Sequence, residues 1–168
     1  MEEARLAVPG DLAAISGISY RVAEEIAGAR GGELFLAQEL ARGPLEPRVT
    51  AAIDNDDALV VVGSYDGVVL GWASVLIETL NDGRRLGVIE TLAVDPEARE
   101  AGIGAAMMNL LLERLRVAGC FGVDSRALPG DRQTKNFFES FGLKARLLIV
   151  HQDFKDHLSA DGDSTTPA

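Results

Sequence analysis

A short loop with two glycines is the segment of this chain best suited to hold a phosphate group. The residues Arg99-Glu100-Ala101-Gly102-Ile103-Gly104 follow a turn at Asp95-Pro96 and lead into apolar residues at helical spacing. The first turn of a helix leaves amide N–H groups without partners, and its dipole attracts anions. Glycines there let a phosphate approach the backbone closely. The loop is therefore a candidate pyrophosphate cradle, although two glycines before a helix also occur in loops that only shape the chain.

A dinucleotide-binding site is the weaker interpretation of the same loop. Met107 replaces the third glycine of that fingerprint. Asp124 does lie about 20 residues farther on, where an acid could bind a ribose. However, the strands expected before the loop are joined by hairpins, and a dinucleotide fold requires βαβ units.

Glu90 is the strongest candidate for an acid–base residue. It lies in the largely apolar stretch Val88–Val94, and strand alternation places it on the same side as Leu92 and Val94. A carboxylate is costly to bury without a partner or a purpose. Glu90 is therefore either a general base or a structural carboxylate bonded to one of the first two helices. His151, on the last expected strand, is the second candidate base, and a packed histidine is its simpler interpretation.

The elements that must position these residues form one mixed α/β layer. The turn sequences Asp66-Gly67 and Asn81-Asp82-Gly83 join three strands into an antiparallel meander. Asp11 is the expected N-cap of the first helix. The expected strands are 4–8, 58–64, 68–78, 86–94, 121–127 and 143–154, and the expected helices follow Asp11 and span 33–41, 48–53, 102–118 and 131–141.

The composition is that of one globular domain. The chain has 168 residues, of which 47% are hydrophobic, enough for a core. We expect a single domain over 1–157 and a disordered tail over 158–168. The single cysteine, Cys120, excludes an internal disulfide.

The charge and the apolar runs restrict the partners. The net charge is −10 and the sequence pI is about 4.6. Such a surface repels nucleic acid and suits a cationic acceptor. The longest apolar stretch, Val68–Ile77, is too short to span a bilayer, and Met1–Arg5 lacks the character of a signal peptide. We expect a cytoplasmic protein that binds neither nucleic acid nor membrane.

Two segments resemble the GNAT superfamily of acetyltransferases. The segment LAVDPEAREAGIGAAMM is similar to the family's acetyl-CoA motif, Arg/Gln-x-x-Gly-x-Gly/Ala, at Arg99, Gly102 and Gly104. The segment TKNFFESFGLKARL resembles its C-terminal pattern, Ala-x-x-Phe-Tyr-x-x-x-Gly-Phe, at Phe137, Gly142 and Leu143. The order of expected elements also agrees over nearly the whole chain. The resemblance implies a mixed, mostly antiparallel central sheet with helices on both faces, split near Val94. It also implies acetyl transfer from acetyl-CoA to a primary amine.

The resemblance also implies roles for individual residues. Glu90 stands where many relatives have a glutamate that deprotonates the amine, and Phe138 replaces a tyrosine that protonates the departing thiolate. Ser125 or a water could substitute for that acid. Asp131 stands in place of a cofactor-binding asparagine or serves as an N-cap, and Lys135 is a candidate phosphate contact. The backbone of Leu92, Ala93 and Val94 would bind the pantetheine arm, and the amides of Arg99, Glu100, Ala101, Gly102, Ile103, Gly104 and Ala105 would bind the pyrophosphate.

The sequence leaves several alternatives open. The acceptor is a small-molecule or peptide amine, no metal is expected, and a homodimer is possible. Because Phe138 cannot donate a proton, the competing hypothesis is a non-catalytic acyl-CoA-binding or regulatory domain of the same fold.

Overall fold

A single five-stranded sheet forms the centre of the computed structural model, which describes residues 1–154. The strands lie in the order β1-β2-β3-β4-β5, with β1 to β4 antiparallel and β5 parallel to β4. Asp66 and Gly67, which close the β2–β3 hairpin, have φ angles of 47° and 81°. Type I′ turns require such positive values, which explains the Asp-Gly sequence there. The strands are β1 (Glu2–Leu6), β2 (Ala58–Tyr65), β3 (Val68–Thr79), β4 (Arg85–Val94) and β5 (Cys120–Asp124).

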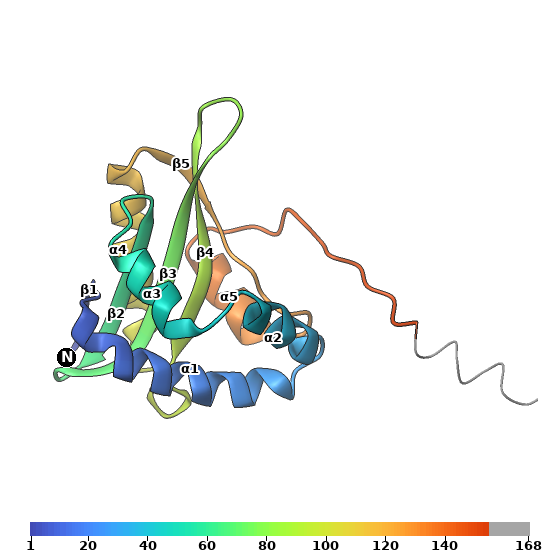
Figure 1. Cartoon of the computed structure of the whole chain (residues 1–168), viewed down its shortest axis with the longest axis horizontal. Coiled ribbons are helices and arrows are strands. Elements are labelled where there is room, and N and C mark those ends of the chain that lie inside the picture. Colours follow the sequence, from blue (N-terminus) through green and yellow to red (C-terminus); the bar gives the residue numbers. More distant parts are fainter. Residues whose placement is uncertain (155–168) are drawn as a thin grey trace, which may run out of the picture.

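Helices cover both faces of the sheet. Figure 1 shows α1 and α3 in front of the strands and α4 behind them. Short 3-10 turns, η1 (Pro9–Asp11) and η2 (Pro96–Ala98), precede α1 and the loop before α4. The predicted mixed, mostly antiparallel sheet with helices on both faces is confirmed. The helices are α1 (Leu12–Ala27), α2 (Gly32–Ala41), α3 (Leu45–Ile53), α4 (Ile103–Val117) and α5 (Arg132–Ser140).

Two hydrophobic clusters hold these layers together. The α4-side core contains Val61, Ala73, Val75, Ile77, Ile89, Ile103, Met107, Met108, Leu111, Leu115 and Phe138. The α1/α3-side core contains Ala7, Ile15, Ile18, Val49, Val60, Val62, Trp72 and Ala93. A Cβ at Gly63 would lie 2.5 Å from Ile103 and 2.9 Å from Met107. Glycine on β2 therefore lets α4 pack directly against the strand backbone.

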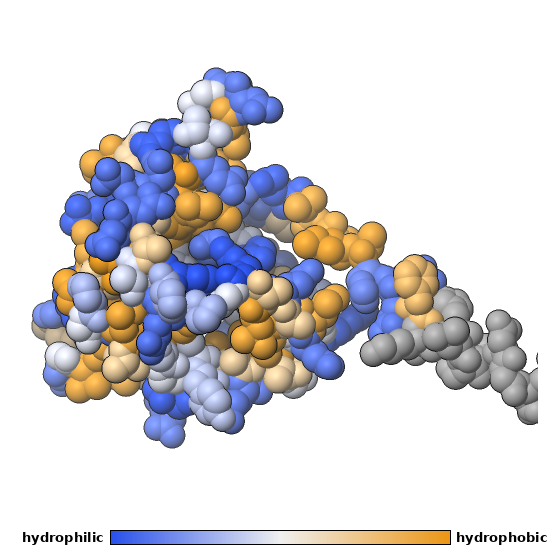
Figure 2. Space-filling model, in the orientation of Figure 1, coloured by the Kyte–Doolittle hydropathy of each residue, from blue (hydrophilic) through white to orange (hydrophobic). Residues whose placement is uncertain are grey.

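The expected last strand, 143–154, is not formed in the described part of the chain. After α5 the chain leaves the body of the molecule (Figure 1), and Arg146 binds Asp124 at the end of β5. The aliphatic side chains from Leu147 to Val150 are 76–84% exposed, and Figure 2 shows apolar surface along this outgoing segment. The sequence pattern was that of a strand, but this stretch gains no ladder partner. The tail predicted over 158–168 and the domain boundary at 157 lie outside the described residues.

Asp11 stands at the predicted N-cap position of α1, but its carboxylate makes no capping bond to that helix. Instead it accepts hydrogen bonds from Arg5 at 2.7 and 2.8 Å and from the backbone N–H of Val8 at 2.8 Å. The hydrogen bond from Arg5 is the main cause that lowers the pKa of Asp11. This buried carboxylate therefore ties the end of β1 to the start of α1.

Candidate active site

Glu90 occupies a β-bulge in β4. Ser74 of β3 pairs with Thr91 and Val75 pairs with Ile89, so Glu90 has no partner on that side of the ladder. A bulge inserts one residue and re-aims the side chains around it.

The bulge overturns the predicted alternation along this strand. Ile89, Leu92 and Val94 all pack on the α4 side, whereas Ala93 belongs to the α1/α3-side core. Glu90 therefore lies on the face opposite to Leu92 and Val94, where it lines a cavity with residues of α3. Regular alternation holds only where no residue is inserted, and the sequence carries no mark of the insertion.

The cavity beside Glu90 has a volume of about 280 Å³ and lies between α3 and the strands β3 and β4. Its charged lining residues are Arg42, Arg48 and Glu90. The side chain of Glu90 is 27% exposed and forms an ion pair with Arg42 at the end of α2. This bond is the main cause that raises the pKa of Arg42. The lining residues are Arg42, Leu45, Arg48, Val49, Ala51, Ala52, Asn55, Ala58, Trp72, Ser74, Val75, Leu76, Glu90 and Thr91.

A cluster of arginines surrounds a second carboxylate at the edge of this cavity. Glu39 of α2 lies 3.2 Å from Arg42, 3.8 Å from Arg48 and 3.1 Å from Arg126. In Figure 2 a strongly hydrophilic band crosses the middle of the face that α3 covers. Sequence reasoning missed this cluster, and its only local signal was the Glu39–Arg42 pair at i,i+3 spacing.

The sheet opens beside Glu90. The pairing of β4 with β5 ends at Val88 and Asp124, and β4 continues to Val94 without a strand on that side in the described residues. The gap therefore begins earlier than the expected split near Val94. Backbone groups along this free edge of β4 are available to an extended ligand.

The loop that follows β4 leads the chain into an anion-attracting helix end. Glu100 and Gly102 have φ angles of 75° and 78°, and Gly102 immediately precedes α4. The amide of Ala106 bonds back to Gly102 O at 3.0 Å. The amides of Ile103, Gly104 and Ala105 stand before it, in the part of a helix whose donors lack intrahelical acceptors. The predicted cradle thus has the required backbone form.

Two ion pairs from α1 fix this loop. Arg21 donates to the buried carboxylate of Asp95 at 2.5 and 2.9 Å, and Glu25 accepts from Arg99 at 2.6 Å. The hydrogen bond to Glu25 is the main cause that raises the pKa of Arg99. The side chain of Arg99 therefore positions the loop. Sequence reasoning missed these contacts. Their only signal was that Arg21 and Glu25 are four residues apart on one segment, as Asp95 and Arg99 are on the other.

The C-terminal candidates do not line the cavity beside Glu90. Asp131 caps α5 by accepting a hydrogen bond from the amide of Thr134 at 3.0 Å. This is the N-cap role, one of the two roles expected for this residue. Lys135 is exposed and pairs with Glu139 at 3.1 Å. Phe138 is 8% exposed and packs in the α4-side core. The structure thus shows structural contacts for all three residues.

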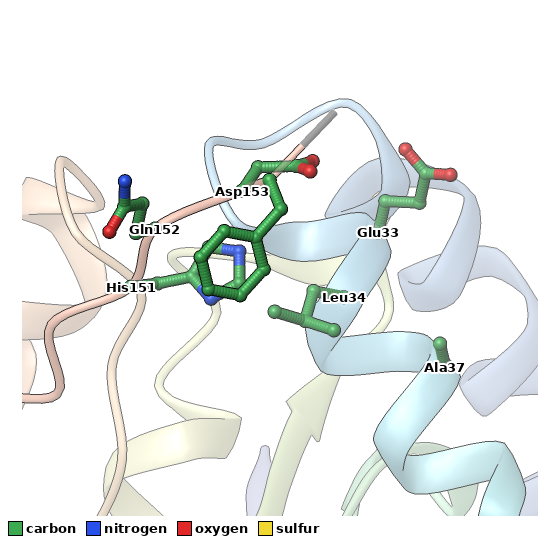
Figure 3. Close-up of a pocket in the computed structure, with 7 residues that line it drawn as sticks. Glu33, Leu34, Ala37, His151, Gln152 and Asp153 are labelled. Atoms are coloured by element: carbon green, nitrogen blue, oxygen red, sulfur yellow. The ribbon is translucent and has the colours of Figure 1, made fainter. Parts of the chain in front are cut away.

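The remaining two candidates are placed differently from the expectation. Ser125 follows β5, which ends at Asp124, and so lies in a loop instead of on the strand. His151 lies on the outgoing segment, in a hollow of about 670 Å³ whose other wall is Glu33, Leu34 and Ala37 of α2 (Figure 3). Because no strand forms there, His151 is not brought to the cavity that Glu90 lines.

Two absences hold for residues 1–154. No helix in this range is long and apolar enough to cross a membrane. No group of three or more histidine, cysteine, aspartate or glutamate side chains in the same range could hold a metal ion.

Solved acetyltransferases share this fold. A glucosamine-6-phosphate N-acetyltransferase from Arabidopsis thaliana has a TM-score of 0.64 at 20% identity, covering 92% of this chain and 99% of that chain. An acetyltransferase from Trypanosoma brucei has a TM-score of 0.61 at 23% identity, covering 91% and 99%. An aminoglycoside acetyltransferase from an uncultured soil metagenomic sample has a TM-score of 0.67 at 16% identity, covering 90% and 94%.

Sequence comparison gives a closer likeness over a shorter region. The glucosamine 6-phosphate N-acetyltransferase of Trypanosoma brucei brucei is 36% identical over 81 residues, which are 47% of this chain and 53% of that protein. The chain thus spans about half the length of this curated relative. The Acetyltransferase (GNAT) family matches residues 23–143. With the sheet, the open edge of β4 and the loop before α4 in agreement, this chain belongs to the GNAT acetyltransferase family.

Proposed function

We propose that this chain transfers an acetyl group from acetyl-CoA to a primary amine of a small molecule. The observation that carries the proposal is the placement of Glu90, whose carboxylate lines a cavity beside the open edge of β4. The named relatives in Trypanosoma and Arabidopsis support an amine acceptor of low molecular mass. The cavity, at about 280 Å³, is near the lower limit for a ligand site, which also favours a small acceptor.

The described residues fit acetyl-CoA at two places. The amides at the start of α4, with Gly102 in the left-handed conformation, suit a pyrophosphate. The free edge of β4 from Leu92 to Val94 suits an extended arm with amide groups. Acetyl-CoA supplies the acetyl group as a thioester.

The residues of this chain act on the acceptor as follows. An ammonium group must lose a proton before its nitrogen can attack a thioester carbonyl. Glu90 accepts that proton, directly or through a water, and Arg42 holds the Glu90 side chain in place. The departing coenzyme A leaves as a thiolate, and a thiol of pKa about 8.5 is a tolerable leaving group without an acid. Ser125 or water supplies the proton that Phe138 cannot.

The proposal is tested by calorimetric titration with acetyl-CoA and by release of the coenzyme A thiol with a panel of amines. Glucosamine 6-phosphate is the first acceptor to try, because it is the substrate in the name of the curated relative. Binding of acetyl-CoA together with acetylation of an amine supports the proposal. Binding without turnover of any amine would favour the non-catalytic acyl-CoA-binding domain, and absence of binding would refute both.

A further inference from the structure

Two buried hydrogen-bond donors in the cavity beside Glu90 lack acceptors. Within the described part of the chain, Arg48 Nε and Trp72 Nε1 are buried and bond to no other atom. Both residues line the cavity, Arg48 from α3 and Trp72 from β3. A buried donor without an acceptor is costly, and such groups are rare in folded proteins. Two such donors on residues that line one cavity need acceptor oxygens that the described residues do not supply.

The charges around the cavity favour an anionic oxygen. Its lining residues include two cations, Arg42 and Arg48, and one anion, Glu90, which Arg42 already binds. Arg48 shares the carboxylate of Glu39 with two other arginines and is the most distant of the three, at 3.8 Å. One positive charge is therefore left over at the cavity, in a chain whose net charge is −10.

We propose that the cavity binds a small amine that also carries a phosphate or a carboxylate, with the N–H groups of Arg48 and Trp72 as donors to that oxyanion. This inference rests on the proposed function, because it names the acceptor class of the same site. The amine then lies toward Glu90, the one carboxylate among the residues that line the cavity. The site thus pairs a cationic pocket for the anionic group with a carboxylate for the ammonium group.

Trp72 provides a direct binding assay, because it is the only tryptophan of the chain. Its fluorescence is titrated with two matched pairs, glucosamine 6-phosphate against glucosamine and serine against ethanolamine, and with inorganic phosphate. We expect saturable changes with the anionic member of at least one pair and binding at least tenfold weaker for its neutral counterpart. The pair that responds identifies phosphate or carboxylate as the preferred group. Equal affinity for the charged and neutral members of both pairs would overturn the inference. Binding of inorganic phosphate with no binding of either anionic amine would overturn it as well.

Three variants assign the donors. Arg48→Gln should weaken binding of the anionic amine roughly tenfold to a hundredfold, the usual effect of losing a hydrogen bond to a charged group. Arg48→Lys should recover only part of that loss, since it restores the charge and lacks Nε. Trp72→Phe, followed by calorimetry, should weaken binding several-fold. Arg126→Gln is the matched control, because Arg126 also contacts Glu39 but does not line the cavity.

The outcomes separate this inference from the proposed function. Acetyl-CoA affinity and the melting temperature are measured for every variant, so that a folding defect is recognised. If the anionic amine binds but is never acetylated, the inference stands and the transferase proposal fails. If only neutral amines bind and are acetylated, the transferase proposal stands and the inference is overturned. Wild-type affinity of a folded Arg48→Gln variant for the anionic amine would likewise overturn it.

Discussion

Glu90→Gln separates the proposed general-base role of this carboxylate from its structural role as the partner of Arg42. Glutamine preserves the size of the side chain and removes its ability to take up a proton. Arg42 loses one carboxylate partner and keeps Glu39, which lies 3.2 Å away. Because the Arg42 and Glu90 side chains are 40% and 27% exposed, the lost ion pair should cost no more than about 1 kcal/mol of folding free energy. The variant should therefore fold and bind acetyl-CoA normally.

The expected loss of activity depends on pH. A positioned general base contributes about 10² to 10⁴ in rate, and kcat/KM at neutral pH should fall by that factor. For an aliphatic amine of pKa about 10.4, roughly one molecule in a thousand is deprotonated at pH 7.4. That fraction rises about a hundredfold by pH 9.4, so the deficit of Glu90→Gln should shrink by up to about the same factor.

The assay is release of the coenzyme A thiol, followed as kcat/KM from pH 7 to 9.5 for wild type and variant. Glu39→Gln is the matched control, because it removes the other carboxylate bound to Arg42 outside the cavity lining. Its pH profile should keep the wild-type slope. Full activity of Glu90→Gln at every pH would refute the reasoning and leave Glu90 as the structural partner of Arg42.

The remaining predictions concern ligand binding and the core. Saturation with acetyl-CoA at a hundredfold excess over Kd should stabilise the fold by about 2.7 kcal/mol, raising Tm by roughly 5 to 11 °C in a melting scan. Asp11→Asn should cost about 1–2 kcal/mol at pH 7 in urea unfolding; because the folded pKa of Asp11 is lowered, this cost should vanish as the pH falls through it. Burial raises the pKa of the Cys120 thiol, so alkylation by iodoacetamide at pH 8 should be slower in the folded protein than in urea. Phe138→Tyr should destabilise the fold by about 1–3 kcal/mol, because the added hydroxyl enters the α4-side core. An unchanged Tm would contradict the burial of Phe138 there.

The central strands were predictable because short-range chemistry determines them. Asp-Gly and Asn-Asp-Gly turns bound the apolar runs of β2, β3 and β4, and the observed bounds differ from the expected ones by no more than one residue at any end. The loop before α4 was predictable for the same reason, since its glycines and the helix that follows are local features. Its attachment to α1 through Asp95 and Arg99 was not, because those ion pairs join residues 74 positions apart.

The outgoing C-terminal segment shows an element that was predicted from local sequence and did not form. Leu147 to Val150 form an aliphatic run that favours a strand on propensity alone. A strand also needs a partner, and in the described residues β5 pairs only with β4. His151 was placed near the active site on the strength of that strand, so the error in the element became an error in the site.

The proposed donor site and the proposed acceptor site are built from different kinds of groups. Backbone groups of β4 and of the start of α4 suit the donor, and backbone groups are insensitive to side-chain changes. The proposed acceptor cavity is instead lined by side chains from the end of α2, from α3 and from the strands β3 and β4, including Arg42, Arg48 and Val49. Solved relatives of the same fold are named for acceptors as different as glucosamine 6-phosphate and aminoglycosides. Under the proposed function, the segment from Arg42 to Asn55 would determine the acceptor, and exchange of Arg48 should alter acceptor choice without altering acetyl-CoA affinity.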